Sequence, residues 1–499
     1  MTSIRSVAIG TILLAVGIAQ AWAETAAESQ EYRQFASRLE AQEAEIRALQ
    51  LQMRRGVNGA NSQSFSLASD ESCGCSKHMI RRLPVVIEHS ISERKSDDDA
   101  ANDYTLRYIC EYDNGFVVRP INRSTHPFEL RTNAWIQFRH GGFARDVESW
   151  TDNSGVIRPV KNRNKFDIER ARLVFSGFAL TPDLTYFLQL DGDTDGQEVV
   201  DFFDYWWGYQ LFECLQIQLG KRKVPGSRQW LLGARHTRFI DRPMVNDFFR
   251  PDRTVGLFAV GTIGETFQYQ AMVGNGLRTA NLEAAEINDK FAYAGTVYWD
   301  PWGDFGGQLV DFECNQNLLA RFGGSFTFGS QSDLAGALPL AESNFARLTD
   351  GTRLTLPGAL AGGVTVSEFD ASLLSIDAAA KWRGWSVNAE AFVRWLQSIE
   401  GDGPLPHDEL VQRGFYVEGG TFLIPSRLDV NVRYSQIDGF YGNAAEVAAG
   451  FNWYPLDTHQ MKVSFDVSDI ASSSLDNTTS EILVGDDGTL FRTQFQVEF

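Results

Sequence analysis

The chain ends in Phe491-Arg492-Thr493-Gln494-Phe495-Gln496-Val497-Glu498-Phe499, and this stretch alternates residue by residue. Phenylalanine, threonine and valine occupy the odd positions, whereas arginine, glutamine and glutamate occupy the even ones. A period of two places these two sets on opposite faces of a β-strand. One face therefore suits lipid and the other suits water. A final amphipathic strand that closes on phenylalanine is typical of a bacterial outer-membrane barrel.

The same alternation recurs between residues 128 and 499 and predicts an all-β fold, a 16-stranded antiparallel transmembrane β-barrel. The connections alternate between long, such as 225–253, and tight, such as Pro425-Ser426, although 301–317 is long where a tight turn is expected. A soluble sandwich is the alternative, but it explains neither the aromatic strand ends nor the terminal phenylalanine. The expected strands are 128–140, 166–180, 184–191, 199–210, 215–224, 254–263, 266–274, 291–300, 318–329, 369–384, 385–399, 414–424, 427–438, 446–456, 460–470 and 489–499.

Three segments precede the predicted barrel. Residues 1–23 read as a signal peptide, because a basic Arg5 precedes an apolar run that ends at the cleavage pattern Ala21-Trp22-Ala23. No later stretch is long and apolar enough for a transmembrane helix, so a membrane protein of this sequence requires a barrel. Residues 58–127 are expected to be an irregular periplasmic segment, with room for one or two strands in 105–118.

Residues 24–57 predict a periplasmic coiled-coil helix. Apolar residues and one glutamine recur there at heptad spacing, which favours self-association, in line with a homotrimer. A single amphipathic helix packed on its own chain is the alternative. The seam consists of Tyr32, Phe35, Leu39, Gln42, Ile46, Leu49 and Met53.

The formal net charge is -19, which argues against nucleic acid as a partner and makes any local basic cluster informative. The third long connection, 225–253, is such a cluster, with six arginines against three aspartates and several large apolar residues. If this loop folds into the barrel, its apolar side chains can pack on the wall while its guanidinium groups face the pore. Arginine suits phosphate because its planar fork stays charged and binds bidentately. The predicted constriction residues are Arg228, Arg235, Arg238, Arg242, Arg250 and Arg253.

An external basic loop that contacts anionic lipid headgroups is the alternative for this connection. Strand parity predicts further arginines on the lumen face of the barrel. Carboxylates such as Glu390 and Asp466 lie on the same face, so each of these arginines is expected by default to pair with an acid across the wall. The predicted lumen arginines are Arg131, Arg139, Arg321, Arg394, Arg433 and Arg492.

Several stretches of residues 110–499 resemble the phosphate-selective porin O and P family. The segments that carry the resemblance are Tyr112-Asp113-Asn114-Gly115-Phe116, Ile168-Glu169-Arg170-Ala171-Arg172, Phe239-Ile240-Asp241-Arg242-Pro243 and Arg250-Pro251-Asp252-Arg253-Thr254-Val255-Gly256. Asp241 and Asp252 stand where the family has glutamate and glycine, whereas the arginines are kept. The resemblance implies a trimer of 16-stranded barrels, each with an inward-folded third loop and basic residues that pass phosphate or polyphosphate.

Other motifs are weak. The stretch from Asp191 to Gly196 begins like a calcium loop, but Phe202 stands at the twelfth position where glutamate is needed, which favours a solvated hairpin tip. The sequence contains neither a G-x-S-x-G elbow nor an H-E-x-x-H pair, so no catalytic residue, metal or cofactor is predicted. The pairing of the five cysteines is left open by their spacing.

Together these patterns predict a porin in the bacterial outer membrane, surrounded by lipid, through which small anions such as phosphate diffuse passively. Two alternatives stay open. One is a general, weakly selective porin, and the other is a structural outer-membrane tether that acts through the coiled coil.

Overall fold

The computed structural model describes residues 85–89, 106–120, 127–194, 200–280, 287–332 and 346–499. The predicted signal peptide and coiled-coil helix lie outside the described residues. None of the described helices is long and apolar enough to cross a membrane.

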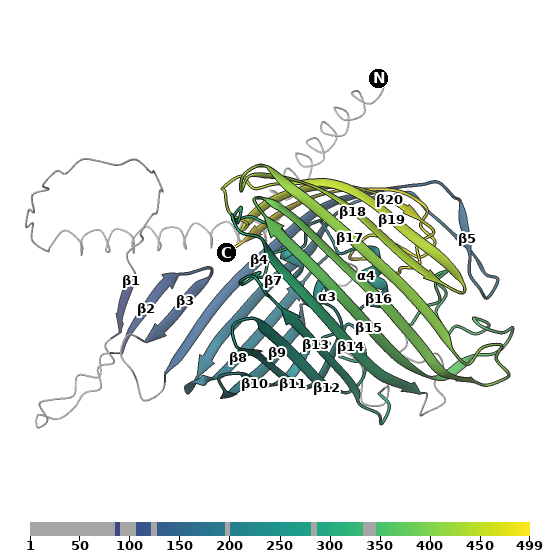
Figure 1. Cartoon of the computed structure of the whole chain (residues 1–499), viewed down its shortest axis with the longest axis horizontal. Helices are drawn as coiled ribbons and strands as arrows, with labels where there is room; N and C mark the ends of the chain where they lie inside the picture. The colour runs from purple at the N-terminus through teal and green to yellow at the C-terminus, as the bar shows by residue number, and fades with distance from the viewer. Residues whose placement is uncertain (1–84, 90–105, 121–126, 195–199, 281–286, 333–345) are drawn as a thin grey trace, which may run out of the picture. The chain divides into compact units, whose positions relative to one another are not determined.

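Sixteen of the described strands form a closed antiparallel barrel, in which the last strand pairs with the first (Figure 1). Each coincides with an expected strand to within a few residues, so the predicted 16-stranded antiparallel barrel is confirmed. The strands are β4 (Phe128–Arg145), β7 (Arg163–Ala179), β8 (Thr181–Gly192), β9 (Asp201–Phe212), β10 (Leu215–Lys223), β11 (Arg253–Ile263), β12 (Phe267–Gly274), β13 (Ala292–Trp299), β14 (Leu319–Ser332), β15 (Val366–Trp382), β16 (Trp385–Gly401), β17 (Leu410–Ile424), β18 (Leu428–Gly439), β19 (Gly442–Trp453), β20 (Met461–Ala471) and β21 (Gly488–Glu498).

The strands differ in length around the barrel. β12 and β13 have 8 residues each, whereas β15 and β16 have 17 each. The wall is therefore lower on the side of β12 and β13 than on the side of β15 and β16.

A small sheet extends the edge of the first barrel strand. β1 (Val85–His89), β2 (Leu106–Tyr112) and β3 (Phe116–Pro120) pair in order, and β3 pairs with residues 130–132 of β4. β21 pairs with residues 135–145 of the same strand, so β3 continues the edge where the last strand ends. The strands expected within 105–118 are present as β2 and β3, but the expectation of an irregular segment is corrected for β1, which the sequence pattern did not reveal.

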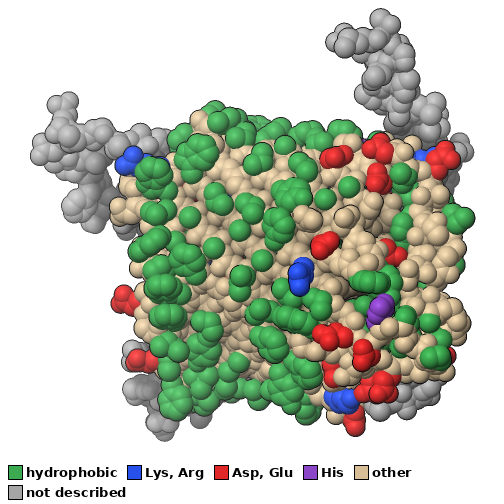
Figure 2. All heavy atoms as spheres, turned by 45° about the vertical axis from the view of Figure 1, so that its right-hand side comes forward, with side chains coloured by type: hydrophobic (Ala, Val, Ile, Leu, Met, Phe, Trp, Pro, Cys, Tyr) green, Lys and Arg blue, Asp and Glu red, His purple; other side chains and the backbone are tan. Residues whose placement is uncertain are grey.

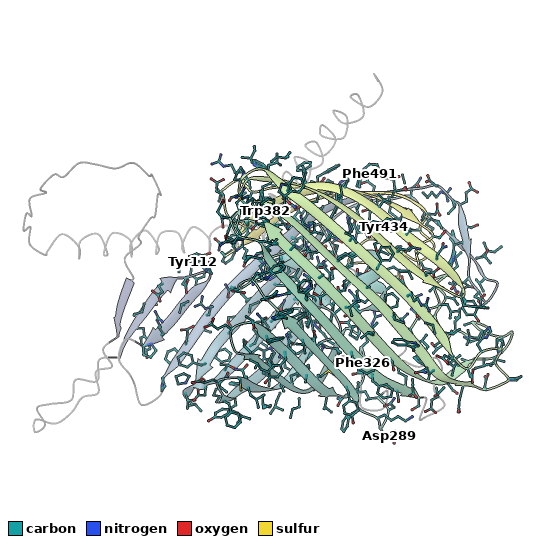
Figure 3. All side chains as sticks on the ribbon, in the orientation of Figure 1. Tyr112, Asp289, Phe326, Trp382, Tyr434 and Phe491 are labelled. Atoms are coloured by element: carbon teal, nitrogen blue, oxygen red, sulfur yellow. The ribbon has the colours of Figure 1, made fainter. Side chains whose placement is uncertain are left out.

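The alternation of the last strand separates an outer apolar face from an inner polar face. Phe491 and Phe495 are 43% and 37% exposed, whereas Arg492 and Gln494 are each 1% exposed. Exposed apolar side chains are found on strands around the whole barrel, among them Phe326, Tyr434 and Phe491 in Figure 3. Figure 2 shows one face on which hydrophobic side chains dominate. An apolar outside with a polar inside is the arrangement that a barrel needs in lipid.

The two ends of the barrel differ in their connections. We call the end that carries the tight turns and the C-terminus the turn end, and the opposite one the loop end. Long connections lie at the loop end, for example 146–162, with the small hairpin β5 (Ser149–Thr151) and β6 (Ile157–Pro159), and 224–252. The connection 300–318 departs from this pattern, because it is long although it lies at the turn end. β13 and β14 pair directly on either side of it, so the connection does not result from a missed strand pair.

Candidate functional site

The third loop, residues 224–252, folds into the barrel and packs on its inner wall. It contains α3 (Arg228–Leu231), η1 (Ala234–His236) and α4 (Met244–Phe249), and Figure 1 shows α3 and α4 within the ring of strands. The apolar side chains of α4 are buried against β16 to β18, and the ring of Phe249 stacks on that of Phe392 at 5.3 Å. Burial of this apolar face is the main force that holds the loop inside.

Carboxylates of the wall accept hydrogen bonds from the backbone of the third loop. Glu390 accepts from the amides of Arg228 and Gln229, at 2.8 and 3.4 Å. Asp466 accepts from the amide of Ile240 at 3.1 Å, and Glu446 accepts from that of Met244 at 2.9 Å. These acids are thereby committed to positioning the loop on the wall formed by β16 to β20.

Two of the six predicted constriction arginines also fix the loop to the wall. Nε of Arg228 lies 2.5 Å from a carboxylate oxygen of Asp377. Arg238, which is 1% exposed, donates to Asn431 at 2.9 Å and to the backbone carbonyl of Leu309 at 3.3 Å. Neither arginine lines the cavities described below, so we assign both to anchoring rather than to contact with a solute.

The connection 300–318 reaches the same region from the turn end. Its Gln308 amide lies 2.7 Å from the ring of His236 in the third loop. Phe312 packs on Phe422 and Tyr454 near the turn end, with ring centroids 5.7 and 5.1 Å away. The third loop is therefore held between the barrel wall and a second insertion from the opposite end.

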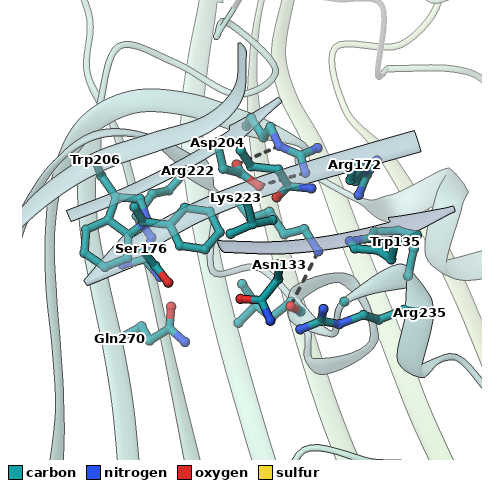
Figure 4. A pocket seen from close by; sticks show the side chains of 17 residues that line it. Asn133, Trp135, Arg172, Ser176, Asp204, Trp206, Arg222, Lys223, Arg235 and Gln270 are labelled. Carbon is teal, nitrogen blue, oxygen red and sulfur yellow. Dashed lines mark hydrogen bonds and ion pairs between the residues drawn. The ribbon is translucent and has the colours of Figure 1, made fainter. Parts of the chain in front are cut away.

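Two adjoining cavities lie between the third loop and the strands β4 and β7 to β12. Cavity 1 has a volume of about 420 Å³ and cavity 2 about 380 Å³. Their linings share Arg172, Lys223, Ala234 and Arg253, so the two spaces meet there. Cavity 1 is also lined by Asn133, Trp135, Val174, Ser176, Phe187, Gln189, Asp204, Trp206, Arg222, Leu231, Gly233, Arg235 and Gln270 (Figure 4). Cavity 2 is also lined by Glu169, Arg170, Asp191, Asp193, Phe203, Lys221, Trp230, Arg242, Arg250, Asp252, Arg278, Ala280 and Thr479.

Basic residues outnumber acidic ones in both cavities. Cavity 1 has five lysines and arginines against one aspartate, and cavity 2 has eight against four acidic residues. The remaining four predicted constriction arginines are among them, because Arg235 lines cavity 1, Arg242 and Arg250 line cavity 2, and Arg253 lines both. The basic excess contrasts with the acidity of the whole chain.

Arginines and aromatic rings alternate along the junction of the cavities. The guanidinium carbon of Arg172 lies 5.0 Å from the ring centroid of Trp135 and 4.1 Å from that of Phe203. The guanidinium carbon of Arg253 lies 3.6 Å from the Phe203 ring and 5.3 Å from the Trp230 ring. An aromatic face attracts a cation without neutralising its charge. This series, from β4 across β7, β9 and β11 to the third loop, therefore fixes positive charge at the junction.

Three more cations surround the last ring of this series. Nζ of Lys223 and the guanidinium carbons of Arg242 and Arg250 lie 4.8, 5.2 and 5.3 Å from the Trp230 ring. Lys223 also donates to the backbone carbonyls of Trp230 and Leu232, at 2.8 and 3.0 Å. The carboxyl end of α3 therefore orients the ammonium group, as expected for the negative end of a helix.

Some cavity cations are paired with carboxylates and others are not. Arg253 binds both oxygens of Asp204 at 2.9 and 3.2 Å, and Arg172 lies 2.7 Å from Asp191. Within the part of the chain that the structure describes, three cavity cations have no carboxylate within ion-pair distance. They are Arg222, Lys223 and Arg242.

Local backbone irregularities bring several of these side chains inward. The register between β8 and β9 shifts, so that Phe203 has no partner residue on β8. As a result, the adjacent residues Phe203 and Asp204 both line a cavity. Gly220 in β10 has φ +144°, and a Cβ there would collide with the backbone of Tyr205 and Trp206. Directly after it, Lys221 to Lys223 all contribute to cavity linings.

The predicted lumen arginines are engaged with the wall and the loops, and none of the six lines cavity 1 or 2. Arg139 illustrates this, because it is fully buried between Asp241 at 3.3 Å and Glu169 at 3.5 Å. Polar partners of the others include Asp113 for Arg131, Asp300 for Arg321, Gln412 for Arg394, Glu446 for Arg433 and Asp466 for Arg492.

Asp241 of the third loop is the hub of this network. Burial acts to raise its pKa, but the guanidinium groups of Arg170 and Arg139, at 3.0 and 3.3 Å, outweigh burial and hold the pKa well below its ordinary value. The carboxylate therefore stays ionised and ties the loop to β4 and β7.

Two further sequence signals, the calcium-like stretch and the cysteines, lie only partly within the described residues. Asp191 and Asp193 of the calcium-like stretch line cavity 2, and the described residues contain no cluster suited to a metal ion. Cys110, Cys214 and Cys314 are free thiols.

Comparison with known proteins gives a family match over the segment that holds most of the site. The family model described as phosphate-selective porin O and P matches residues 140–310, which confirms the resemblance seen in the sequence. The matched segment contains the third loop and β7 to β13. No curated protein matches the chain.

Several solved structures are similar to this chain. The anion-selective porin from Comamonas acidovorans has 11% identity and a TM-score of 0.48, with 74% of this chain and 100% of that chain covered. The outer membrane channel DcaP of Acinetobacter baumannii has 10% identity and a TM-score of 0.46, with 76% and 99% covered. Salmonella typhi OmpF in complex with daunomycin has 12% identity and a TM-score of 0.45, with 74% and 98% covered.

The closed barrel, its apolar outside and its inward-folded loop define the class of fold, a 16-stranded β-barrel whose third loop narrows the interior. The match to the phosphate-selective porin O and P model extends over residues 140–310 of this barrel.

Proposed function

We propose that small anions, phosphate among them, diffuse passively through this barrel by way of cavities 1 and 2. The observation that carries the proposal is the series Arg222, Lys223 and Arg242. Arg222 lines cavity 1, Lys223 lines both cavities and Arg242 lines cavity 2, and no carboxylate of the described residues lies within ion-pair distance of them. A continuous excess of basic groups along one path favours anions in a narrow, low-dielectric passage.

The separation of acidic from basic side chains inside the barrel supports the same proposal. The acids that face the third loop on β16, β19 and β20 are bound by loop amides or wall arginines, whereas the basic residues gather on the side of β7, β10 and β11. A solute that passes between the loop and β7 to β11 thus meets mainly positive charge. Guanidinium and ammonium groups there replace part of its hydration shell.

Orientation, assembly and the N-terminal region are part of the proposal. We place the turn end in the periplasm, since short turns on that side and long external loops are the rule for such barrels. We further propose a homotrimer supported by the heptads of residues 24–57. Deletion of residues 28–55 tests this, because loss of trimers in light scattering with channel activity kept would assign the helix to oligomerisation, whereas loss of envelope attachment with trimers intact would assign it to tethering.

Ion selectivity of the purified protein in a planar bilayer tests the proposed function. Under a potassium chloride gradient, we expect a reversal potential of the sign for anion preference, and added phosphate should reduce the chloride current. In the triple variant Arg222→Gln, Lys223→Gln, Arg242→Gln, both effects should weaken strongly. Arg427→Gln removes one charge at an exposed turn that pairs with Asp457, away from both cavities, and serves as the control.

The outcomes separate the candidate functions. Anion preference that the triple variant loses supports the proposal. A cation-preferring or unselective pore that is indifferent to phosphate overturns it and leaves a general porin. Absence of conductance from correctly folded protein would favour the structural role.

A further inference from the structure

The two cavities differ in their apolar surface. Cavity 2 is lined mostly by charged side chains, with only Phe203, Trp230 and two alanines as apolar members. Cavity 1 combines its cations with a larger apolar set, namely Trp135, Val174, Phe187, Trp206, Leu231 and Ala234. An amphipathic lining of this kind suits a ligand with an apolar body and a charged end.

Aromatic rings on neighbouring strands lie side by side in cavity 1. The rings of Phe187 and Trp206 stack at 5.6 Å with an interplanar angle of 7°. The guanidinium carbon of Arg222 lies 5.3 Å from the Trp206 ring and 5.1 Å from the Phe258 ring. Figure 4 shows Trp206 and Trp135 on opposite sides of the space, with Lys223 between them.

The charged end of cavity 1 is its junction with cavity 2. Lys223 and Arg253 belong to both linings, and Arg235 adds a third cation to cavity 1. Arg253 and Arg235 are partly neutralised by Asp204 and Glu498, at 2.9 Å each. The contacts of Lys223 with other described residues are to carbonyl oxygens and to the Trp230 ring. An anionic group at this junction would therefore meet Lys223 as the unpaired charge.

We propose that cavity 1 is a binding subsite for organic anions that carry an aromatic ring, of the class of aromatic carboxylates such as benzoate. The carboxylate lies at the junction near Lys223, and the ring lies against Leu231, Trp135 and Trp206. The volume of about 420 Å³ falls within the range of about 300–1,000 Å³ that is usual for small-molecule sites. This inference rests on the proposed function, because it names a solute class for the same anion path.

Block of the chloride current by benzoate, compared with block by acetate, tests the inference. The two anions share charge and carboxylate geometry, so their difference reports the ring alone. We expect half-block by benzoate at a concentration about tenfold lower than by acetate, as the burial of part of one ring predicts.

Two variants locate the effect. Leu231→Asn makes one wall of cavity 1 polar, and Trp206→Leu removes a ring, so both should bring the acetate-to-benzoate ratio of half-blocking concentrations close to one. Ala280→Asn introduces the same amide into cavity 2 and should leave that ratio as in the unaltered protein. Trp206→Phe keeps an aromatic ring and should retain most of the difference.

The failure of this inference differs from failure of the proposed function. An anion-selective channel with equal block by benzoate and acetate overturns the aromatic subsite alone. A benzoate preference that Ala280→Asn reduces as much as Leu231→Asn would also overturn it, since the ring would not then lie in cavity 1. A channel without anion preference overturns the proposed function and the subsite together.

Discussion

The guanidinium carbon of Arg253 lies 3.6 Å from the centroid of the Phe203 ring, and the same guanidinium binds both oxygens of Asp204, the next residue in β9. One arginine at the junction of the two cavities is thus fixed by two adjacent residues, of which the aspartate reduces its charge and the phenylalanine does not. The two partners should therefore affect selectivity differently.

Phe203→Leu should weaken anion preference while the formal charge of the pore stays the same. The ring contributes to holding Arg172 and Arg253 in place, at about 0.5–2 kcal/mol for each cation–aromatic contact. Its loss lets both side chains move toward their acids. The measurement is the reversal potential of the variant in a potassium chloride gradient, with Phe203→Tyr as the matched control that keeps the ring. Equal selectivity in Phe203→Leu and the unaltered protein would contradict this role.

Asp204→Asn should have the opposite effect and increase anion preference. The substitution removes the one acidic residue among the described residues that line cavity 1, so that Asp252, at 3.4 Å, remains as the carboxylate partner of Arg253. The chloride-to-potassium permeability ratio measures the change, and Asp457→Asn, at an exposed turn, is the charge-matched control. A ratio that falls in Asp204→Asn would show that the aspartate matters chiefly for the geometry of Arg253.

Arg238→Gln should loosen the third loop. The arginine is buried and connects the loop to Asn431 on β18 and to Leu309 of the turn-end insertion. Loss of one partner from such a buried network costs about 3–5 kcal/mol. We expect a lower melting temperature and larger fluctuations of single-channel current. Quiet channels of unchanged stability would rule out the anchoring role, and Arg427→Gln again controls for the lost charge.

Selectivity should decline as salt increases. The Debye length falls from about 10 Å at 0.1 M to about 3 Å at 1 M salt, so only anions close to the cavity cations would then feel them. Reversal potentials at a fixed concentration ratio and rising mean concentration measure this decline. Selectivity that does not change with salt would point to direct coordination at the junction instead of the field of the whole basic path.

The sequence predicts the barrel well because strand alternation is a local property. Each of the expected strands appears, down to the last one with Phe491 and Phe495 outside and Arg492 inside. The connection 301–317 breaks the expected alternation of long and tight connections. Its own sequence does not indicate that it folds back to contact Arg238 and His236 of the third loop.

The site is predicted less completely, because its members depend on contacts between distant strands. Composition identifies 225–253 as basic and apolar, but it cannot tell that Arg228 faces Asp377 on the wall while Arg242 faces cavity 2. Arg172 stands in a segment that resembles the porin family, and Lys221 to Lys223 directly precede the basic loop, but neither position tells which cavity a side chain lines. Trp206 carries no signal of its own, because its place in cavity 1 depends on the pairing of β9 with its neighbours.

The unequal strand lengths have a consequence for the surrounding bilayer. An eight-residue strand such as β12 or β13 measures about 27 Å, and at a tilt near 40° it covers only about 21 Å of membrane thickness, less than the usual apolar band of about 25 Å. The seventeen-residue strands β15 and β16 cover about 44 Å by the same reasoning. Hydrocarbon chains beside the low flank must compress, or another protein surface must shield it, since exposed mismatch costs a fraction of a kcal/mol for each ångström. The barrel thus imposes a thickness gradient on its lipid annulus, and the low flank is the side on which contact with a neighbouring protein relieves the most membrane strain.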